Sequence, residues 1–84
     1  MVFLAITPKG LEEALKLAKP NDDAVWCTSD TITEKEFNDM EGVNLTRFNY
    51  SFAADEADSV NGAIETIQEH HPGETVWVER SDEL

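Results

Sequence analysis

Basic residues, cysteine and glycine are all scarce in this chain of 84 residues, and the first two shortages exclude classes of function. Six Lys and Arg stand against 18 Asp and Glu, and the net charge of −12 argues against direct binding to nucleic acid or to anionic membranes. A single cysteine excludes an internal disulfide. No apolar run approaches the roughly 20 residues of a membrane helix, and the opening MVFLAIT lacks the basic segment of a signal peptide. These absences predict a protein of the cytoplasm.

The few glycines also limit phosphate chemistry. The chain has four glycines, and none belongs to a phosphate-binding pattern such as GxxxxGK[ST]. TPKG at positions 7–10 nevertheless follows an apolar segment and opens a helix, which is where ligands sit in open α/β sheets. Backbone N–H groups there can hold an anion, with Lys9 nearby. A plain capped turn is the simpler interpretation of the same residues.

Four apolar segments alternate with three helical patterns. The segments 2–6, 24–28, 43–52 and 74–79 indicate strands, and the third has Phe48, Tyr50 and Phe52 as its inward positions. Helical patterns begin at Pro8 and cover 34–41 and 56–70. We expect a single α/β domain over 1–79, with the order βαβαβαβ and a mainly parallel four-stranded sheet flanked by three helices. Residues 80–84 are expected to form a frayed tail.

The order of the strands within the sheet is less constrained. We expect 2-1-3-4, as in a small flavodoxin-like sheet. The alternative is a ferredoxin-like βαββαβ sandwich, in which the 34–41 helix would only decorate a connection between two strands. The capping signals favour a true helix there, because Thr33 and Glu36 form a capping box and Ile32 and Phe37 occupy the positions of a hydrophobic staple.

Cys27 lies in VWCT (25–28), which the chain nearly repeats as VWVE (76–79). A nucleophilic cysteine needs a lowered pKa, from a helix N-terminus or a neighbouring cation, and access to solvent. The next helix begins only near residue 34, Asp30 adds negative charge, and Thr33 stands where a phosphatase-type loop has arginine. We therefore predict that Cys27 is a buried structural residue.

Other candidates for chemistry are incomplete. His70 and His71 are adjacent at a helix end, but no third metal ligand has a recognisable spacing, so no metal and no cofactor are predicted. The stretch LAITPKGLEEALKLA (4–18) resembles the opening of the N-terminal domain of a family of cobalamin-biosynthesis proteins. The match is confined to this strand–turn–helix segment and carries no function to the chain.

Two sets of polar residues are the candidate sites. The first comprises acidic residues on two helices that would meet a basic partner: Glu34, Glu36, Asp39, Glu41, Asp58, Glu65 and Glu69. The second comprises loop residues that a parallel sheet would gather at the carboxyl ends of its strands: Thr7, Lys9, Gly10, Ser29, Asp30, Ser51, Asp55 and Arg80. A charged helix face opposite the core can also be plain solvated surface, and Gly62 within the third helix would let a partner approach closely.

The leading hypothesis is a non-enzymatic interaction module. Its acidic faces would take the place of phosphates and mask a basic protein such as a nuclease, a toxin or a nucleic-acid-binding protein. Small acidic nuclease inhibitors of the barstar type offer an analogy of architecture and charge only. One alternative is a domain that binds a small ligand or phosphate through the strand-end loops. Another is a bacterial or phage accessory structural protein that self-associates through an edge strand.

Overall fold

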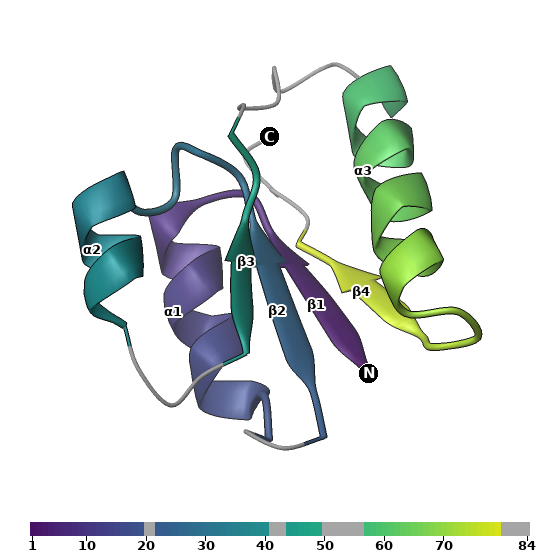
Figure 1. The fold of residues 1–84 in the computed structure, drawn as a ribbon, viewed down its shortest axis with the longest axis horizontal. Helices are drawn as coiled ribbons and strands as arrows, with labels where there is room; N and C mark the ends of the chain where they lie inside the picture. The colour runs from purple at the N-terminus through teal and green to yellow at the C-terminus, as the bar shows by residue number, and fades with distance from the viewer. Residues whose placement is uncertain (20–21, 41–43, 50–56, 80–84) are drawn as a thin grey trace.

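The computed structural model describes residues 1–19, 22–40, 44–49 and 57–79. Four parallel strands form one sheet in the order β3-β2-β1-β4 (Figure 1). The strands are β1 (Val2–Ala5), β2 (Ala24–Cys27), β3 (Leu45–Arg47) and β4 (Val76–Val78). Together with three helices they form a single small α/β domain, as the sequence predicted, and the parallel pairing excludes the ferredoxin-like alternative.

The predicted strand order 2-1-3-4 is wrong, because β2 is an inner strand and β3 an edge strand. The physical reason lies in the residues of these strands. All four residues of β2 are buried, whereas every residue of β3 is only half-buried. An inner strand must be apolar on both faces, which β2 is, while the Thr and Arg of β3 suit an edge.

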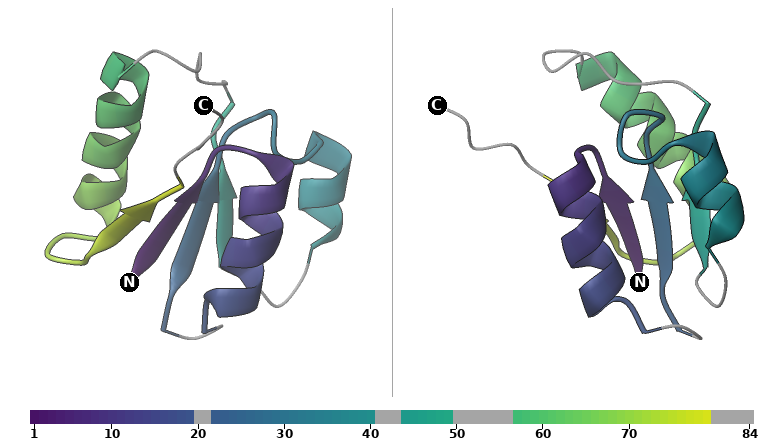
Figure 2. Two further views of the ribbon diagram at one scale, coloured as in Figure 1. Left: turned by 180° about the vertical axis from the view of Figure 1, so that it is seen from behind. Right: turned by 90° about the vertical axis from the view of Figure 1, so that its left-hand side faces the viewer.

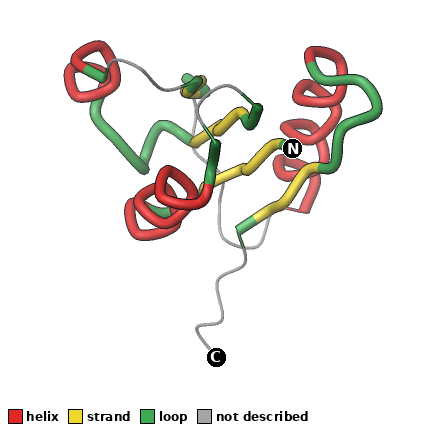
Figure 3. Tube along the Cα trace, turned by 90° about the horizontal axis from the view of Figure 1, so that it is seen from below, coloured by secondary structure: helices red, strands yellow, loops and turns green. Residues whose placement is uncertain are grey.

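The helices cover the two faces of the sheet. Helices α1 (Pro8–Leu17) and α2 (Glu34–Asp39) lie on one face, and α3 (Ala57–His70) lies on the other (Figures 1 and 3). Each face has its own buried cluster: Val2, Leu4, Trp26, Phe48 and Ile67 belong to the cluster under α3, and Ala5, Leu11, Val25 and Cys27 belong to the cluster under α1. Within the described ranges, no helix is both long and apolar enough to span a bilayer.

The helix starts follow the capping signals. The Thr7 hydroxyl accepts a hydrogen bond from the Gly10 backbone N–H at 3.1 Å and caps α1, with Pro8 at the first helical position. Thr33 and Glu36 form the predicted capping box of α2. Helix α3 begins within one residue of its predicted start and ends where predicted.

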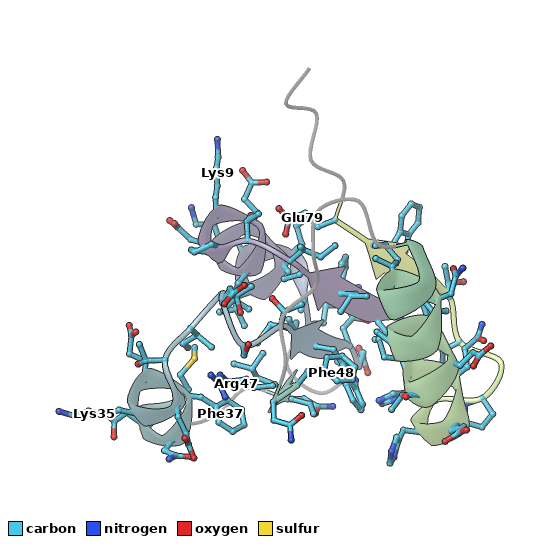
Figure 4. The ribbon with its side chains drawn as sticks, turned by 90° about the horizontal axis from the view of Figure 1, so that it is seen from above. Lys9, Lys35, Phe37, Arg47, Phe48 and Glu79 are labelled. Atoms are coloured by element: carbon cyan, nitrogen blue, oxygen red, sulfur yellow. The ribbon has the colours of Figure 1, made fainter. Side chains whose placement is uncertain are left out.

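The third strand is shorter than predicted. It ends at Arg47. Phe48 follows it and is buried, with its ring centroid 5.2 Å from that of Trp26. Arg47 and Phe48 point to opposite faces of the sheet (Figure 4). Tyr50 and Phe52, the other predicted inward positions, lie outside the described residues.

Candidate functional site

The chain changes faces of the sheet between β1 and β4. Helix α1 follows β1 on one face, whereas α3 reaches β4 across the other face (Figure 2). In open α/β sheets such a switch point creates a crevice at the carboxyl ends of the strands, and ligands bind there. The sequence placed Thr7, Lys9 and Gly10 after the first strand, at the carboxyl edge of the sheet, and the structure does bring them to the carboxyl end of β1.

The carboxylate of Glu79 occupies this turn. Glu79 directly follows β4, and its Oε1 accepts hydrogen bonds from the backbone N–H groups of Ile6 at 2.6 Å and Thr7 at 2.8 Å. Its Oε2 accepts a third from the Thr7 hydroxyl. A carboxylate at the start of α1 is also favoured by the helix dipole. The donors that would bind an incoming anion are thus engaged by the chain's own side chain, and an anion would have to displace Glu79.

Gly10 allows this close approach. A Cβ atom at position 10 would lie 1.9 Å from the Glu79 Oε1 atom, well inside contact distance. Lys9, by contrast, is exposed and points away from Glu79 (Figure 4). The sequence therefore indicated the turn and its glycine, but assigned to an external anion the place that Glu79 fills. The signal for Glu79 was its position as the first polar residue after an apolar strand.

A second hollow lies at the carboxyl ends of β2 and β3, around the predicted Ser29 and Asp30. Arg47 organises its wall: the guanidinium Nε donates to the Ile32 carbonyl at 2.9 Å and Nη2 donates to the Ser29 carbonyl at 3.1 Å. The hollow measures about 670 Å³, and its lining is Pro8, Ser29, Asp30, Thr31, Ile32, Thr33, Glu34, Glu36 and Arg47. Three carboxylates and one cation engaged by backbone carbonyls make this hollow unfavourable for an anion.

The remaining predicted loop residues add nothing to the Glu79 turn or to the second hollow. Ser51, Asp55 and Arg80 lie outside the described residues. Thr7 and Ser29 are both at the carboxyl edge of the sheet, yet Thr7 contacts Glu79 while Ser29 lines the second hollow. Glu79 and Arg47 lie apart on this edge, the first beside α1 and the second beside α2 (Figure 4).

The acidic residues of α2 and α3 lie at the surface but form two separate faces. Glu34, Glu36 and Asp39 are exposed on α2, and Glu65 and Glu69 are exposed on α3, across the sheet. Within the described part of the chain, none of these five carboxylates forms an ion pair. Glu36 does bond to Thr33 in the capping box. Glu41 and the side chain of Asp58 lie outside the described residues.

Cys27 is fully buried, with a side chain turned toward α1. Burial raises the pKa of its thiol, and the Thr31 hydroxyl and the Arg47 charge lower it only in part. A protonated thiol without access to solvent is a poor nucleophile. The structure thus agrees with the structural role that the sequence predicted for this cysteine.

The two histidines support the core beside α3. The Trp26 indole N–H donates to His71 Nε2 at 3.4 Å, and His71 Nδ1 lies 3.0 Å from the Glu74 carboxylate. The indole contact makes Nε2 the acceptor nitrogen of the His71 ring. His70 stacks at a tilt on Trp26, with ring centroids 5.5 Å apart. Across the described ranges, no group of three or more His, Cys, Asp or Glu side chains is arranged to hold a metal ion.

Comparison of the chain with known protein families, with curated proteins and with solved structures finds no match.

Proposed function

We propose that this protein is a non-enzymatic interaction module of the cytoplasm that binds a basic protein through its acidic helix faces. The observation that carries the proposal is the state of the carboxylates on α2 and α3. They are exposed, and no cation in the described part of the chain neutralises them. With a net charge of −12 on 84 residues, they give a field that would speed encounter with a cationic surface.

The described side chains also make catalysis the weaker proposal. The single cysteine is buried, and burial keeps its thiol protonated. The turn at the switch point has its donors engaged by Glu79. Carboxylates presented on a rigid helix can instead imitate the phosphates that a nuclease, a toxin or a nucleic-acid-binding protein recognises.

The position of the helices limits how a partner would bind. Because α2 and α3 cover opposite faces of the sheet, a compact partner would meet one acidic face at a time. Gly62 favours the α3 face, since it is exposed beside Glu65 and Glu69 and a Cβ there would have no neighbour within 4 Å. The open space means that glycine is not required for folding at this position, although alanine would stabilise the helix by about 1 kcal/mol.

Charge reversal on each face in turn tests the proposal. The immobilised protein would capture partners from a lysate of its host, with elution by a salt gradient, and each dissociation constant would then be measured. We expect Glu65→Lys/Glu69→Lys to weaken binding about tenfold or more and to flatten its salt dependence. Glu34→Lys/Asp39→Lys tests the α2 face and spares the Glu36 cap.

The matched control is Glu12→Lys/Asp22→Lys, which changes the net charge equally at two exposed positions outside α2 and α3. A basic partner that both face variants bind as tightly as this control does would contradict the proposal. Gly62→Ala refines the result, because a partner seated closely on α3 should bind this variant less well even though its helix is more stable.

A further inference from the structure

Exposed apolar side chains gather at one place on the described surface. Four large hydrophobic residues of the described chain are exposed: Met1 (47%), Leu17 (69%), Trp77 (55%) and Val78 (37%). Exposed apolar residues are ordinarily scattered singly over a protein surface. Here Leu17, Trp77 and Val78 all line one groove between α1 and β4, together with Phe3, Ala14 and Gly10.

The sheet register explains why the groove is open. Trp77 pairs with Phe3, so both side chains lie on the α1 face of the sheet. Helix α1 packs on β1 and β2, whereas α3 lies against β4 from the opposite face (Figure 1). The α1 face of the described sheet is therefore open at β4, beside α1, and Trp77 lies on this open part.

The charges of the groove select its occupant. Glu13 and Glu79 are the charged residues of its lining, and both are acidic. A second copy of the chain would bring these acids against its own net charge of −12, which opposes self-association. A cationic partner is attracted by the same charges.

The size of the groove suits an anchoring side chain. Its volume is about 250 Å³, which is below the roughly 300–1,000 Å³ of pockets that enclose small molecules. Such a volume suits one or two apolar side chains that anchor a protein partner, as in the central pockets of protein interfaces.

We infer that the groove between α1 and β4 is a docking site for a basic amphipathic helix of a partner protein. Apolar side chains of that helix enter between Leu17 and Trp77, and flanking Lys or Arg residues face Glu13 and Glu79. This inference rests on the proposed function and gives it a third, partly apolar surface. Charge attraction brings the partner close, and the groove supplies the desolvated contact that slows dissociation.

Two synthetic peptides test the inference on the full chain. Both are 18-residue amphipathic helices with Leu at the a and d positions of each heptad, and one carries Lys at the flanking e and g positions where the other carries Glu. The protein has two tryptophans, which give two indole N–H signals in a ¹⁵N-labelled sample. We expect the Lys peptide to shift the Trp77 signal while the Trp26 signal stays, and the Glu peptide to shift neither.

Variants locate the contact. Leu17→Lys removes an exposed apolar side chain, adds a cation at the groove and should weaken the Lys peptide at least tenfold. Gln68→Lys adds the same charge at an exposed position of α3 and should have little effect. Glu13→Lys should weaken binding as well, by reversing the rim charge. Equal binding by the Leu17→Lys and Gln68→Lys variants would overturn the groove as the docking site.

The outcomes separate this inference from the proposed function. If the Lys peptide shifts only signals of α2 or α3, the groove is overturned and the acidic-face proposal stands. If both peptides bind the groove equally, the basic character of the occupant is overturned. If the Trp77 signal moves with protein concentration alone and the sedimentation mass doubles, the occupant is a second copy. If neither peptide binds, groove docking is overturned whatever the charge-reversal experiment shows.

Discussion

Strands β2 and β4 carry nearly the same sequence and have opposite environments. In VWCT, Trp26 is 7% exposed and packs under α3, whereas in VWVE, Trp77 is 55% exposed on the α1 face. The difference arises from register: Trp26 pairs with Leu4 of β1, while Trp77 pairs with Phe3. A shift of one residue turns every side chain of a strand to the other face.

The comparison shows that place in the sheet, and not local sequence, decides what a residue does. Cys27 and Val78 are equivalent in the repeat, yet Cys27 is buried toward α1 and Val78 is exposed at an edge strand. The fourth residues, Thr28 and Glu79, both reach the end of β1 from its two sides. Thr28 donates to the Ile6 carbonyl at 3.4 Å, and Glu79 accepts from the Ile6 N–H at 2.6 Å.

Thiol labelling gives the largest contrast between the two strands. A Val78→Cys variant carries one exposed and one buried thiol, and the exposed one should react at once with a disulfide reagent. Cys27 reacts only when the domain opens, so an unfolding free energy of about 5 kcal/mol would slow it by about 10³-fold or more. Its raised pKa slows it further at neutral pH. Rapid labelling of Cys27 in the unmodified chain would contradict its buried position.

Replacement of each tryptophan by alanine should lower the free energy of unfolding by very different amounts in the two strands. Trp26→Ala deletes a core side chain that contacts Phe48 and bonds to His71, and we expect a loss of about 3–5 kcal/mol in the free energy of unfolding. Trp77→Ala should change it by less than about 1 kcal/mol. Urea unfolding measures both. If Trp26→Ala does not fold, Trp26→Phe keeps an aromatic ring in the core and removes the indole N–H, at a smaller cost. Equal costs for the two alanine variants would be inconsistent with the register.

The fourth positions of the repeat provide the next contrast. Glu79→Ala leaves the Ile6 and Thr7 donors without their carboxylate and should cost about 1–3 kcal/mol. Thr28→Val loses one long hydrogen bond to Ile6 and should cost about 1 kcal/mol or less. Chemical denaturation of both variants measures the difference.

Gly10→Ala checks the same contact from the other side, since its Cβ would expel the Glu79 carboxylate. The Gly10→Ala/Glu79→Ala double variant should cost about as much as the worse single change, because both remove one interaction. Fully additive costs would mean that Glu79 does not contact the α1 turn in solution.

The smallest effect concerns the other ends of β2 and β4, which the Met1 ammonium joins. It lies 3.5 Å from Asp23 and 2.9 Å from Glu74. The hydrogen bond to Glu74 raises the pKa of the ammonium, so its contribution is present below about pH 8 and lost as pH rises further. The backbone N–H of Lys19 lowers the pKa of Asp23, and the ammonium lowers that of Glu74. Their contributions are present above about pH 4 and lost as pH falls through the lowered values.

Unfolding midpoints measured from pH 3 to pH 10 test this pattern. We expect the unfolding midpoint to reach a plateau between the two limits, with a shallow decline on each side, because the Met1 ammonium and Glu74 are exposed. Acetylation of the amino terminus should remove the alkaline decline and reduce the acid one. An unchanged alkaline decline after acetylation would show that the ammonium is not its cause.

Much of the fold could be predicted because local signals determine it. The Thr33/Glu36 box, Thr7 with Pro8 and the apolar face of the first helix all act within one turn of chain, and each helix starts within one residue of its expected place. The order of the strands depends on burial at a distance. The contrast between the apolar AVWC and the more polar LTR indicated this order. The alternation of strands and helices along the chain does not take that contrast into account.

The residues of the candidate sites also differ in whether local sequence can predict them. Glu65 and Glu69 of α3 are exposed because they lie opposite the apolar positions of their own helix, which the sequence shows directly. Glu79 meets Thr7 only through pairing of β4 with β1, so its position after an apolar strand marks the residue but does not reveal this contact. The groove at Trp77 depends on the one-residue difference in register between β2 and β4. It also depends on the position of α1, which leaves Trp77 uncovered.

The link between Glu79 and the end of β1 also bears on the order of folding events. The Thr28–Ile6 contact closes 22 residues of chain, whereas the Glu79–Ile6 contact closes 73. The longer closure costs about 1 kcal/mol more in chain entropy, and β4 brings few buried residues to offset it. We therefore expect β4 to dock after the transition state, so that Glu79→Ala speeds unfolding in stopped-flow experiments and leaves the folding rate nearly unchanged.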